Sequence, residues 1–291
     1  MRTLQLQGKA VVITGAASGI GRALAQALGQ QGARLLLADI DVAGLQAIGD
    51  ELRSKGVQCR ILPTDSGSEA ALYALAAHAM ECLGGADIVI NNAGVSVVAP
   101  VENLPTPDAH WLMNINFWGV VHGCHAFLPQ LRQRPDALLV NISSIFAMVS
   151  MPTQSMYNAS KAAVRGFSDA LREELRGSSV GVLCVHPGGI KTNIANSARM
   201  IDLAQVADTA QEFKDNFQQV ARTTPAQAAA VILRAIEQRK TRVLIGADAK
   251  LLDLLYRLFP TRVTPWMNAL GQRLRTAAEA KRKANTAHKS P

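Results

Sequence analysis

Short apolar runs alternate along the chain with longer stretches of helical periodicity. Seven runs are predicted to be strands, and several are continuously apolar, as is typical of strands buried on both faces. They lie at residues 11–14, 34–39, 58–64, 88–91, 138–143, 180–186 and 242–246. Helical patterns lie between them, at residues 20–31, 42–55, 67–83, 106–133, 156–176 and 225–238. This alternation predicts an α/β fold with a doubly wound parallel sheet and right-handed crossovers.

Composition is consistent with one globular domain and an extension. Of the 291 residues, 48% are hydrophobic and 18% are charged, which excludes a disordered chain, and the aromatic content of 4% requires an aliphatic core. We find no repeat or low-complexity linker within residues 1–247. These residues are predicted to form a single domain, and residues 248–291 are predicted to form a separate C-terminal extension.

The formal charge of +8 is concentrated at the C-terminal end. Net +5 falls within the last twenty residues, from Arg273, Arg275, Lys281, Arg282, Lys283 and Lys289 against Glu279. The remainder is only weakly basic, so we expect no nucleic-acid partner. A solvated tail is the favoured interpretation, and contact with acidic lipid is the alternative.

The spacing of the cysteines and the lengths of the apolar runs argue against a metal-binding, secreted or membrane-spanning protein. Cys59, Cys82, Cys124 and Cys184 form no CxxC pair or metal-ligand cluster, so we expect buried thiols, no metal and a reducing, cytoplasmic location. The sequence contains neither a signal-peptide pattern at its start nor 18 consecutive apolar residues without a charge.

A glycine-rich segment, "TGAASGIG", lies between the first predicted strand and the first helix. Gly15, Gly19 and Gly21 would allow a sharp turn and the close approach of a diphosphate to free N–H groups at the helix start. The second strand ends at Asp39, where a carboxylate can accept hydrogen bonds from both ribose hydroxyls and would repel the additional phosphate of NADP. NAD is therefore the favoured cofactor, and NADP remains the alternative.

Six motifs occur in order: "TGAASGIG", "NNAG" at 91–94, "INFWG" at 115–119, "NISS" at 141–144, "YNASK" at 157–161 and "HPGGIKT" at 186–192. Together they resemble the short-chain dehydrogenase/reductase family over about residues 6–247. The resemblance implies a Rossmann-like seven-stranded sheet, a nicotinamide cofactor, and interconversion of an alcohol and a carbonyl.

The resemblance also implies roles for particular residues. Tyr157 would be the general acid/base, Lys161 its partner, Ser144 the hydroxyl that polarises the substrate, and Asn116 the fourth member of a tetrad. Tyr157 and Lys161 would also contact the cofactor. The other implied cofactor residues are Gly15, Ser18, Gly19, Ile20, Gly21, Asp39, Asp65, Asn91, Ala93, Gly94, Pro187, Gly188, Ile190 and Thr192.

Acid–base chemistry supports the catalytic roles independently. A phenol has a pKa near ~10, and an ammonium group one helical turn away, from Lys161 to Tyr157, would favour the phenolate. Ser144 follows a buried strand and would therefore lie at the carboxyl edge of the sheet, where ligands bind. Alone, Tyr-x₃-Lys would more often be a surface pattern and the serine a turn residue.

The segments bordering the expected nicotinamide site are mainly apolar. Residues 94–100, 145–156 and a variable lid at 193–225 would surround the substrate, and no basic pair is placed there to bind a carboxylate or phosphate. Ser144, Phe146, Met151 and Tyr157 are the predicted substrate contacts. These features favour a lipophilic or uncharged secondary alcohol or ketone.

The extension carries an amphipathic pattern. Leu251, Leu255, Leu258 and Phe259 are predicted to form one helix face, Pro260 to end the helix, and a second helix to follow Pro265. Packing against the body or another subunit is the favoured role, and peripheral membrane contact is the alternative. Because relatives assemble through two long helices, here 106–133 and 156–176, we expect a homo-oligomer.

The sequence therefore predicts an NAD-dependent secondary-alcohol dehydrogenase or carbonyl reductase. An NADPH-dependent 3-oxoacyl-type ketoreductase is the alternative enzyme, and a non-catalytic cofactor sensor on the same fold is the alternative class.

Overall fold

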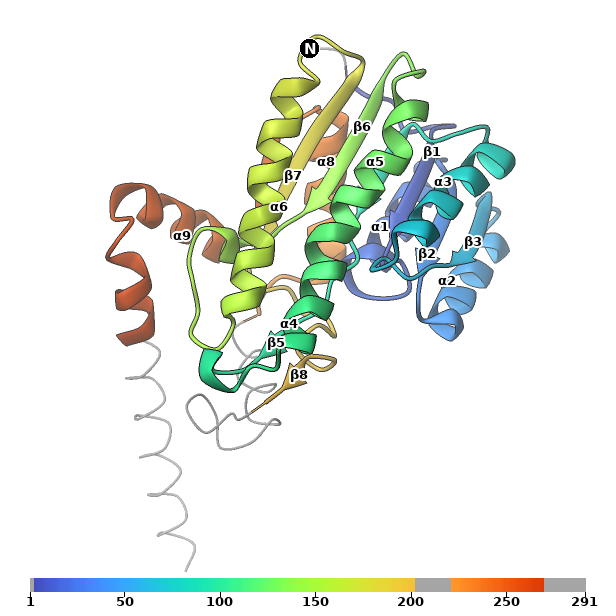
Figure 1. Ribbon diagram of the computed structural model, residues 1–291. Helices are drawn as coiled ribbons and strands as arrows, with labels where there is room; N and C mark the ends of the chain where they lie inside the picture. The colour runs from blue at the N-terminus through green and yellow to red at the C-terminus, as the bar shows by residue number, and fades with distance from the viewer. Residues whose placement is uncertain (1–2, 202–220, 270–291) are drawn as a thin grey trace, which may run out of the picture.

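The computed structural model describes residues 3–201 and 221–269 and is built on one parallel sheet (Figure 1). Its strands have the order β3-β2-β1-β4-β6-β7-β9, and every neighbouring pair is parallel. They are β1 (Ala10–Thr14), β2 (Arg34–Asp39), β3 (Cys59–Pro63), β4 (Ile88–Asn91), β6 (Ala137–Ile142), β7 (Val180–Pro187) and β9 (Arg242–Ile245). The predicted seven-stranded, doubly wound α/β fold is confirmed.

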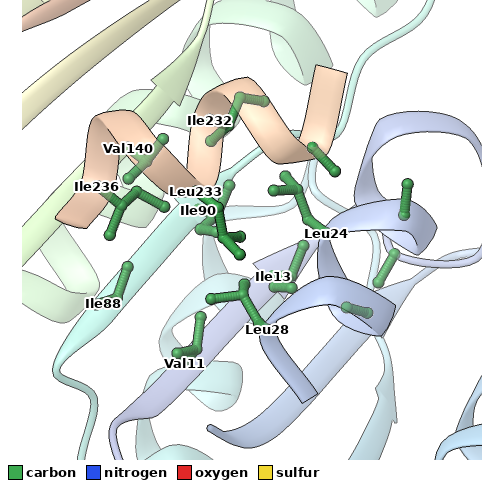
Figure 2. Close-up of a cluster of buried hydrophobic side chains, with 14 of the residues drawn as sticks. Val11, Ile13, Leu24, Leu28, Ile88, Ile90, Val140, Ile232, Leu233 and Ile236 are labelled. Atoms are coloured by element: carbon green, nitrogen blue, oxygen red, sulfur yellow. The ribbon is translucent and has the colours of Figure 1, made fainter. Parts of the chain in front are cut away.

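Helices cover both faces of the sheet. Those on one face are α1 (Gly19–Gln30), α2 (Val42–Ser54) and α8 (Pro225–Glu237), and those on the other are α3 (Glu69–Leu83), α5 (Gly119–Leu131) and α6 (Ser155–Glu174). Alternate residues of β1 enter opposite cores: Val11 and Ile13 face α1 and α8, whereas Ala10 and Val12 face α3 and α5. Figure 2 shows the first of these cores, with Leu24 and Leu28 of α1 beside Ile232 and Ile236 of α8. Both faces of the strands are therefore buried, which explains their continuously apolar sequences.

The long helix predicted at 106–133 is interrupted. It consists of α4 (Thr106–Met113), one π-helical segment at Asn114–Trp118, and α5. The chain also forms a second sheet that was not predicted, in which β5 (Val97–Val98) pairs with β8 (Arg199–Met200). Two-residue strands are too short to leave a period-two pattern, so periodicity could not predict them.

The extension begins with α9 (Ala247–Leu258), which ends just before Pro260 as predicted, and a further helical segment covers residues 263–269. Pro265 lies within the first turn of that segment and not before it, a position where a missing N–H costs no helical hydrogen bond. Figure 1 shows α9 beside the lower part of α6, at the β9 end of the sheet.

The apolar face predicted for α9 is correct only in part. Leu255 packs toward the body, but Leu251 and Leu258 are exposed, and the buried Asp253 forms ion pairs with Arg242 (2.5 Å) and Arg257 (3.1 Å). The face turned toward the body carries Ala249, Leu252, Asp253 and Tyr256. A buried carboxylate requires a partner, and Arg242 of β9 provides one, so charge pairing decides which side of α9 faces inward.

Candidate active site

The glycine-rich loop connects β1 to α1 at the carboxyl edge of the sheet. Gly15 has φ +65° and Gly19 has φ +53°, backbone conformations that favour glycine. A Cβ on Gly15 would lie 2.8 Å from the Ala93 Cα, and one on Gly21 would collide with the Gly15 carbonyl oxygen. The loop is therefore as tight as its sequence predicted.

The start of α1 fits an anionic group. Ser18 occupies the N-cap position, is exposed and makes no side-chain capping hydrogen bond, and the first turn contains no acidic residue. Free N–H groups, the positive end of the helix dipole and a free hydroxyl together suit a dinucleotide diphosphate. The adjacent Ile20 is half-buried and packs against the core, which anchors the turn.

Asp39 lies at the end of β2, beside this loop. Its Oδ2 accepts from the Ala17 N–H (2.8 Å) and its Oδ1 from the Asp41 N–H (3.0 Å). The carboxylate thus braces the glycine-rich loop as well as facing the position expected for a ribose. Asp65 follows β3, the next strand along the edge, is exposed, and accepts from the Gly67 N–H (2.8 Å).

Asn92 was missed by the sequence analysis. Its Nδ2 donates to the carbonyl oxygens of both Thr14 and Gly15, each at 2.9 Å, so it fastens the glycine-rich loop to the end of β4. The Thr14 hydroxyl accepts from the backbone N–H groups of Asn92 and Ala93. The second Asn of "NNAG" was the available signal, but only the strand order places β4 beside β1.

Asn91 and Gly94 have different surroundings. Asn91 is buried against α5, and its Nδ2 donates to Asn141 Oδ1 (2.9 Å), so any contribution of Asn91 to a nucleotide site is limited to its main chain. Gly94 is exposed, and a Cβ there would lie 3.3 Å from Asn116 Oδ1 and 3.4 Å from Lys161 Nζ. Gly94 therefore leaves space directly over two of the predicted catalytic side chains.

The turn after β7 approaches the glycine-rich loop from the other side. Pro187 ends β7, Ile190 is buried and forms a bridge with Thr223, and a Cβ on Gly19 would lie 3.2 Å from the Thr192 methyl group. Asp248 of α9 braces this turn by accepting from the Gly189 N–H (2.7 Å), and its carboxylate fills the space that a side chain at Gly188 would need. The role of Asp248 was not predicted.

Three of the predicted catalytic side chains converge beside the end of β6. The Ser144 side chain lies close enough to the Tyr157 phenol to act on its pKa, and Lys161 Nζ lies 5.8 Å from the centre of the Tyr157 ring. Lys161 also donates to the Ile142 carbonyl oxygen (3.0 Å), which fixes its ammonium at the strand end. The helical spacing of Tyr157 and Lys161 thus places both on the side of α6 that faces the sheet.

Burial shifts the pKa of both α6 groups in a direction that the sequence analysis did not anticipate. Burial raises the pKa of Tyr157 to about 12, although the Ser144 side chain acts to lower it. Burial lowers the pKa of Lys161 to about 8. Desolvation therefore outweighs the expected effect of Lys161 on the Tyr157 pKa, and the phenol is protonated at neutral pH.

Asn116 is fully buried in the π-helical segment. Its Oδ1 accepts from the Val95 N–H (2.8 Å), and its Nδ2 donates to the Val95 carbonyl oxygen (3.0 Å) and the Ser160 hydroxyl (3.1 Å). The wider π turn lets the side chain reach across to the segment after β4. Asn116 therefore links the segment after β4 to α6 through Ser160, the residue directly before Lys161.

His186 contacts the main chain of Ser144 from the neighbouring strand β7. It is fully buried in β7, and its Nδ1 lies 3.2 Å from the Ser144 carbonyl oxygen. Burial, reinforced by the nearby Arg242 cation, lowers the pKa of His186 to about 4, so the ring is neutral at pH 7. The neutral ring can donate through Nδ1 to that carbonyl.

Phe146 and Met151 border a cavity of about 530 Å³ between α6, residues 146–153 and the segment 263–269. Ser144 and Tyr157 do not line it, but the Phe146 ring packs edge-on against Tyr157, with ring centres 6.3 Å apart. The four predicted substrate contacts therefore lie close together but do not share one cavity. Residues 202–220 of the predicted lid lie outside the described residues.

Within the part of the chain that the structure describes, no three His, Cys, Asp or Glu side chains are grouped to hold a metal ion. All four cysteines are free thiols. None of the described helices has the length and apolar character needed to cross a membrane.

Comparison with known proteins identifies the family. The short chain dehydrogenase family model matches residues 9–202. SadH of Mycobacterium tuberculosis, a protein named as an oxidoreductase, is 39% identical over 277 residues, covering 94% of this chain and 96% of that protein. Dehydrogenase/reductase SDR family member 7B of Bos taurus is 34% identical, covering 81% of this chain and 73% of that protein.

Among solved structures, a short chain dehydrogenase/reductase of Burkholderia phymatum in complex with NAD has a TM-score of 0.78 and 31% identity, and the match covers 88% of this chain and 96% of that one. The sequence relatives, the family model and the fold agree. The chain therefore belongs to the short-chain dehydrogenase/reductase family and is a nicotinamide-dependent oxidoreductase.

Proposed function

We propose that this enzyme interconverts a secondary alcohol and a ketone, uses NAD(H), and relies on Asn116, Ser144, Tyr157 and Lys161. The observation that carries the proposal is the convergence of Ser144 and Lys161 on the Tyr157 phenol at the carboxyl edge of the sheet. A protein that only sensed the cofactor would not require this arrangement.

The chain's own groups account for the proton transfer. The bound nicotinamide supplies the hydride in ketone reduction and accepts it in alcohol oxidation. Tyr157, protonated at neutral pH, donates its proton to the carbonyl oxygen in reduction, so that the phenol O–H bond breaks as the alcohol O–H bond forms. Ser144 hydrogen-bonds to the same oxygen, and the Lys161 ammonium stabilises the phenolate left behind.

Asn116 acts as a positioning residue in this scheme. Its three hydrogen bonds join Val95 to Ser160, directly before Lys161, and so fix the segment after β4 relative to α6. His186, bonded to the Ser144 carbonyl, positions the serine from the strand side.

Asp39 supports NAD over NADP. Its carboxylate would accept hydrogen bonds from ribose hydroxyls and repel a 2′-phosphate, and the following Ile40 is 71% exposed and supplies no positive charge. Asp39→Asn combined with Ile40→Arg keeps an acceptor for the Ala17 N–H, removes the negative charge and adds a cation. We expect this variant to shift the NADH/NADPH ratio of kcat/KM by at least roughly tenfold toward NADPH, and Ile40→Gln serves as the control.

The substrate is proposed to be lipophilic or uncharged. Phe146, Met151 and Ala147 supply apolar surface beside Tyr157, and none of the described residues that line the cavity is a cation. A 3-oxoacyl-type ketoreductase is the second candidate, which shares the tetrad, but the carboxylate of Asp39 argues against its usual preference for NADPH.

The deciding experiment is a panel of secondary alcohols and ketones, with the absorbance of the reduced cofactor followed for both nicotinamides. We expect turnover with uncharged substrates and NAD(H), and a loss of at least roughly a hundredfold in Tyr157→Phe, with cofactor binding retained. Undiminished turnover in Tyr157→Phe would refute the mechanism, and turnover restricted to NADPH and 3-oxoacyl substrates would favour the second candidate.

We also propose that the chain forms a homo-oligomer through the outer faces of α5 and α6. Trp118, directly before α5, is 46% exposed, and α6 exposes the small residues Ala159, Ala162 and Gly166, of which Ala159 and Ala162 also line the cavity beside Phe146. Aromatic residues are enriched at subunit interfaces, so the exposed Trp118 is the main support for this surface.

A further inference from the structure

Exposed apolar side chains are concentrated on the C-terminal extension. Among the described residues, eleven large hydrophobic side chains are exposed, and five of them lie within 251–266. These five, which we call the apolar ridge, are Leu251 (57%), Leu254 (54%), Leu258 (61%), Phe259 (42%) and Trp266 (48%).

The ridge follows from the way α9 docks. Leu251, Leu254 and Leu258 are separated by three and four residues and therefore share one side of the helix. The opposite side carries Asp253, whose ion pair with Arg242 fixes the inward face, so the leucines cannot turn inward without exposing that pair. Trp266 of the following segment packs against Phe259, with ring centres 5.4 Å apart, which extends the ridge beyond α9.

The charges beside the ridge are positive. Lys250 and Arg257 flank the leucines on α9, and Arg262 lies between Phe259 and Trp266 in sequence; all three are exposed. The two acidic groups of α9 are already engaged: Asp253 pairs with both Arg242 and Arg257, and Asp248 accepts from the Gly189 N–H. One carboxylate shared by two arginines leaves a net positive charge beside the ridge. The sequence that follows adds Arg273, Arg275, Lys281, Arg282, Lys283 and Lys289 against only Glu279.

We propose that the apolar ridge and its flanking cations dock on an anionic lipid bilayer. Leucine and aromatic side chains on one side of a helix, with Lys and Arg beside them, are typical of helices that lie in the interface of a membrane. The cations are attracted to an anionic surface, and the ridge stabilises the bound state through burial of its apolar area. In this arrangement residues 1–247 stay outside the bilayer, and the protein associates with the membrane reversibly.

An anionic bilayer explains the cations beside the apolar ridge better than a second copy of the chain or the residues after 269 would. A second copy of the same ridge would bring Lys250, Arg257 and Arg262 close to their own counterparts, which repel. The residues after 269 offer only Leu270 and Leu274 as large apolar side chains, too few to cover five. An anionic bilayer satisfies both the apolar area and the cations.

Vesicle sedimentation with the full-length protein tests the proposal. One set of vesicles is phosphatidylcholine alone, and the other contains about 30% phosphatidylglycerol. We expect binding to the anionic vesicles that weakens as salt increases. The double variant Leu251→Gln/Leu254→Gln should bind at least roughly tenfold more weakly, and Arg257→Gln/Arg262→Gln should lose most of the dependence on phosphatidylglycerol.

The matched control is Tyr73→Gln/Met80→Gln, which removes two side chains of similar exposure (48% and 47%) from α3 and should bind like the unaltered protein. Thermal melting of each variant checks the fold without depending on catalysis. Absence of binding to anionic vesicles, or equal loss in the control, would overturn the proposal. Light scattering that shows a ridge-dependent oligomer without vesicle binding would assign the ridge to a second copy instead.

Discussion

At the scale of single residues, burial sets the protonation of the catalytic pair. Tyr157 and Lys161 lie on the inner side of α6, where loss of solvent disfavours the charged form of each: the pKa of the phenol rises to about 12 and that of the ammonium falls to about 8. The Lys161 ammonium donates to the Ile142 carbonyl oxygen, a neutral acceptor, so its charge is only partly compensated. The site therefore retains a destabilising cation, as expected if the proposed mechanism requires one there.

Lys161→Met should therefore stabilise the cofactor-free protein while abolishing turnover. Because the pKa of Lys161 is lower in the folded state than in the unfolded state, the unfolded chain binds more protons between about pH 8 and pH 10.5. The penalty is complete below pH 8 and declines as pH rises. We expect the variant to gain on the order of 1 kcal/mol at pH 7, measured by denaturant unfolding.

The gain should shrink when unfolding is measured at pH 9.5, because the Lys161 penalty is smaller there, while Tyr157 is present in both proteins and its titration cancels in the comparison. Lys161→Arg is the control, because it retains a cation and should show no such gain. A Lys161→Met protein less stable than the parent at pH 7 would contradict this account of the buried charge.

At the scale of elements, the carboxyl edge is held together by contacts between segments that are distant in sequence. Asn92 at the end of β4 fastens the glycine-rich loop after β1, Asp39 at the end of β2 braces it from the other side, and Asp248 of α9 holds the turn after β7. The loop is crowded as well as strained, since its glycines face the Ala93 backbone and the Thr192 side chain.

Gly15→Ala and Gly56→Ala separate crowding from strain. Both glycines have positive φ (+65° and +78°), but a Cβ at Gly56 meets nothing within 4 Å, whereas one at Gly15 would lie 2.8 Å from the Ala93 Cα. We expect Gly56→Ala to cost about 1 kcal/mol in stability and to leave NADH affinity unchanged. Gly15→Ala should weaken NADH binding at least roughly tenfold, as measured by fluorescence titration, and equal affinities in the two variants would refute this role for the loop.

At the scale of the whole molecule, two exposed surfaces are proposed to bind partners, one on the catalytic domain and one on the C-terminal extension. The outer side of α5 and α6 is proposed as a subunit interface and the apolar ridge as a membrane contact, and they differ in charge: cations flank the ridge, whereas an aromatic residue and small side chains mark the helix pair.

Trp118→Arg should dissociate the oligomer. A charge placed at the centre of the α5–α6 surface would be desolvated on assembly, so we expect a lower molar mass by size-exclusion chromatography with light scattering. Tyr73→Arg, at a site of similar exposure on α3, should retain the parental mass. Retention of that mass by Trp118→Arg would place the interface elsewhere.

The sequence by itself determined the fold class and the order of the strands along the chain, and it supplied the predicted site residues. Strand–helix periodicity is local, and the motifs at Gly15 and Ser144 directly follow strands, whose ends a parallel sheet gathers at one edge. Strands and helices can be predicted from the linear sequence because each element is longer than the uncertainty in its predicted boundaries.

Only the tertiary structure decided which neighbours each side chain meets. Desolvation of Tyr157 and Lys161 depends on everything packed around α6, the inward face of α9 depends on Arg242 arriving from β9, and the roles of Asn92 and Asp248 depend on strands and helices far apart in sequence. Burial, charge pairing and long-range hydrogen bonds are properties of three-dimensional proximity, and a linear pattern of residues does not specify them.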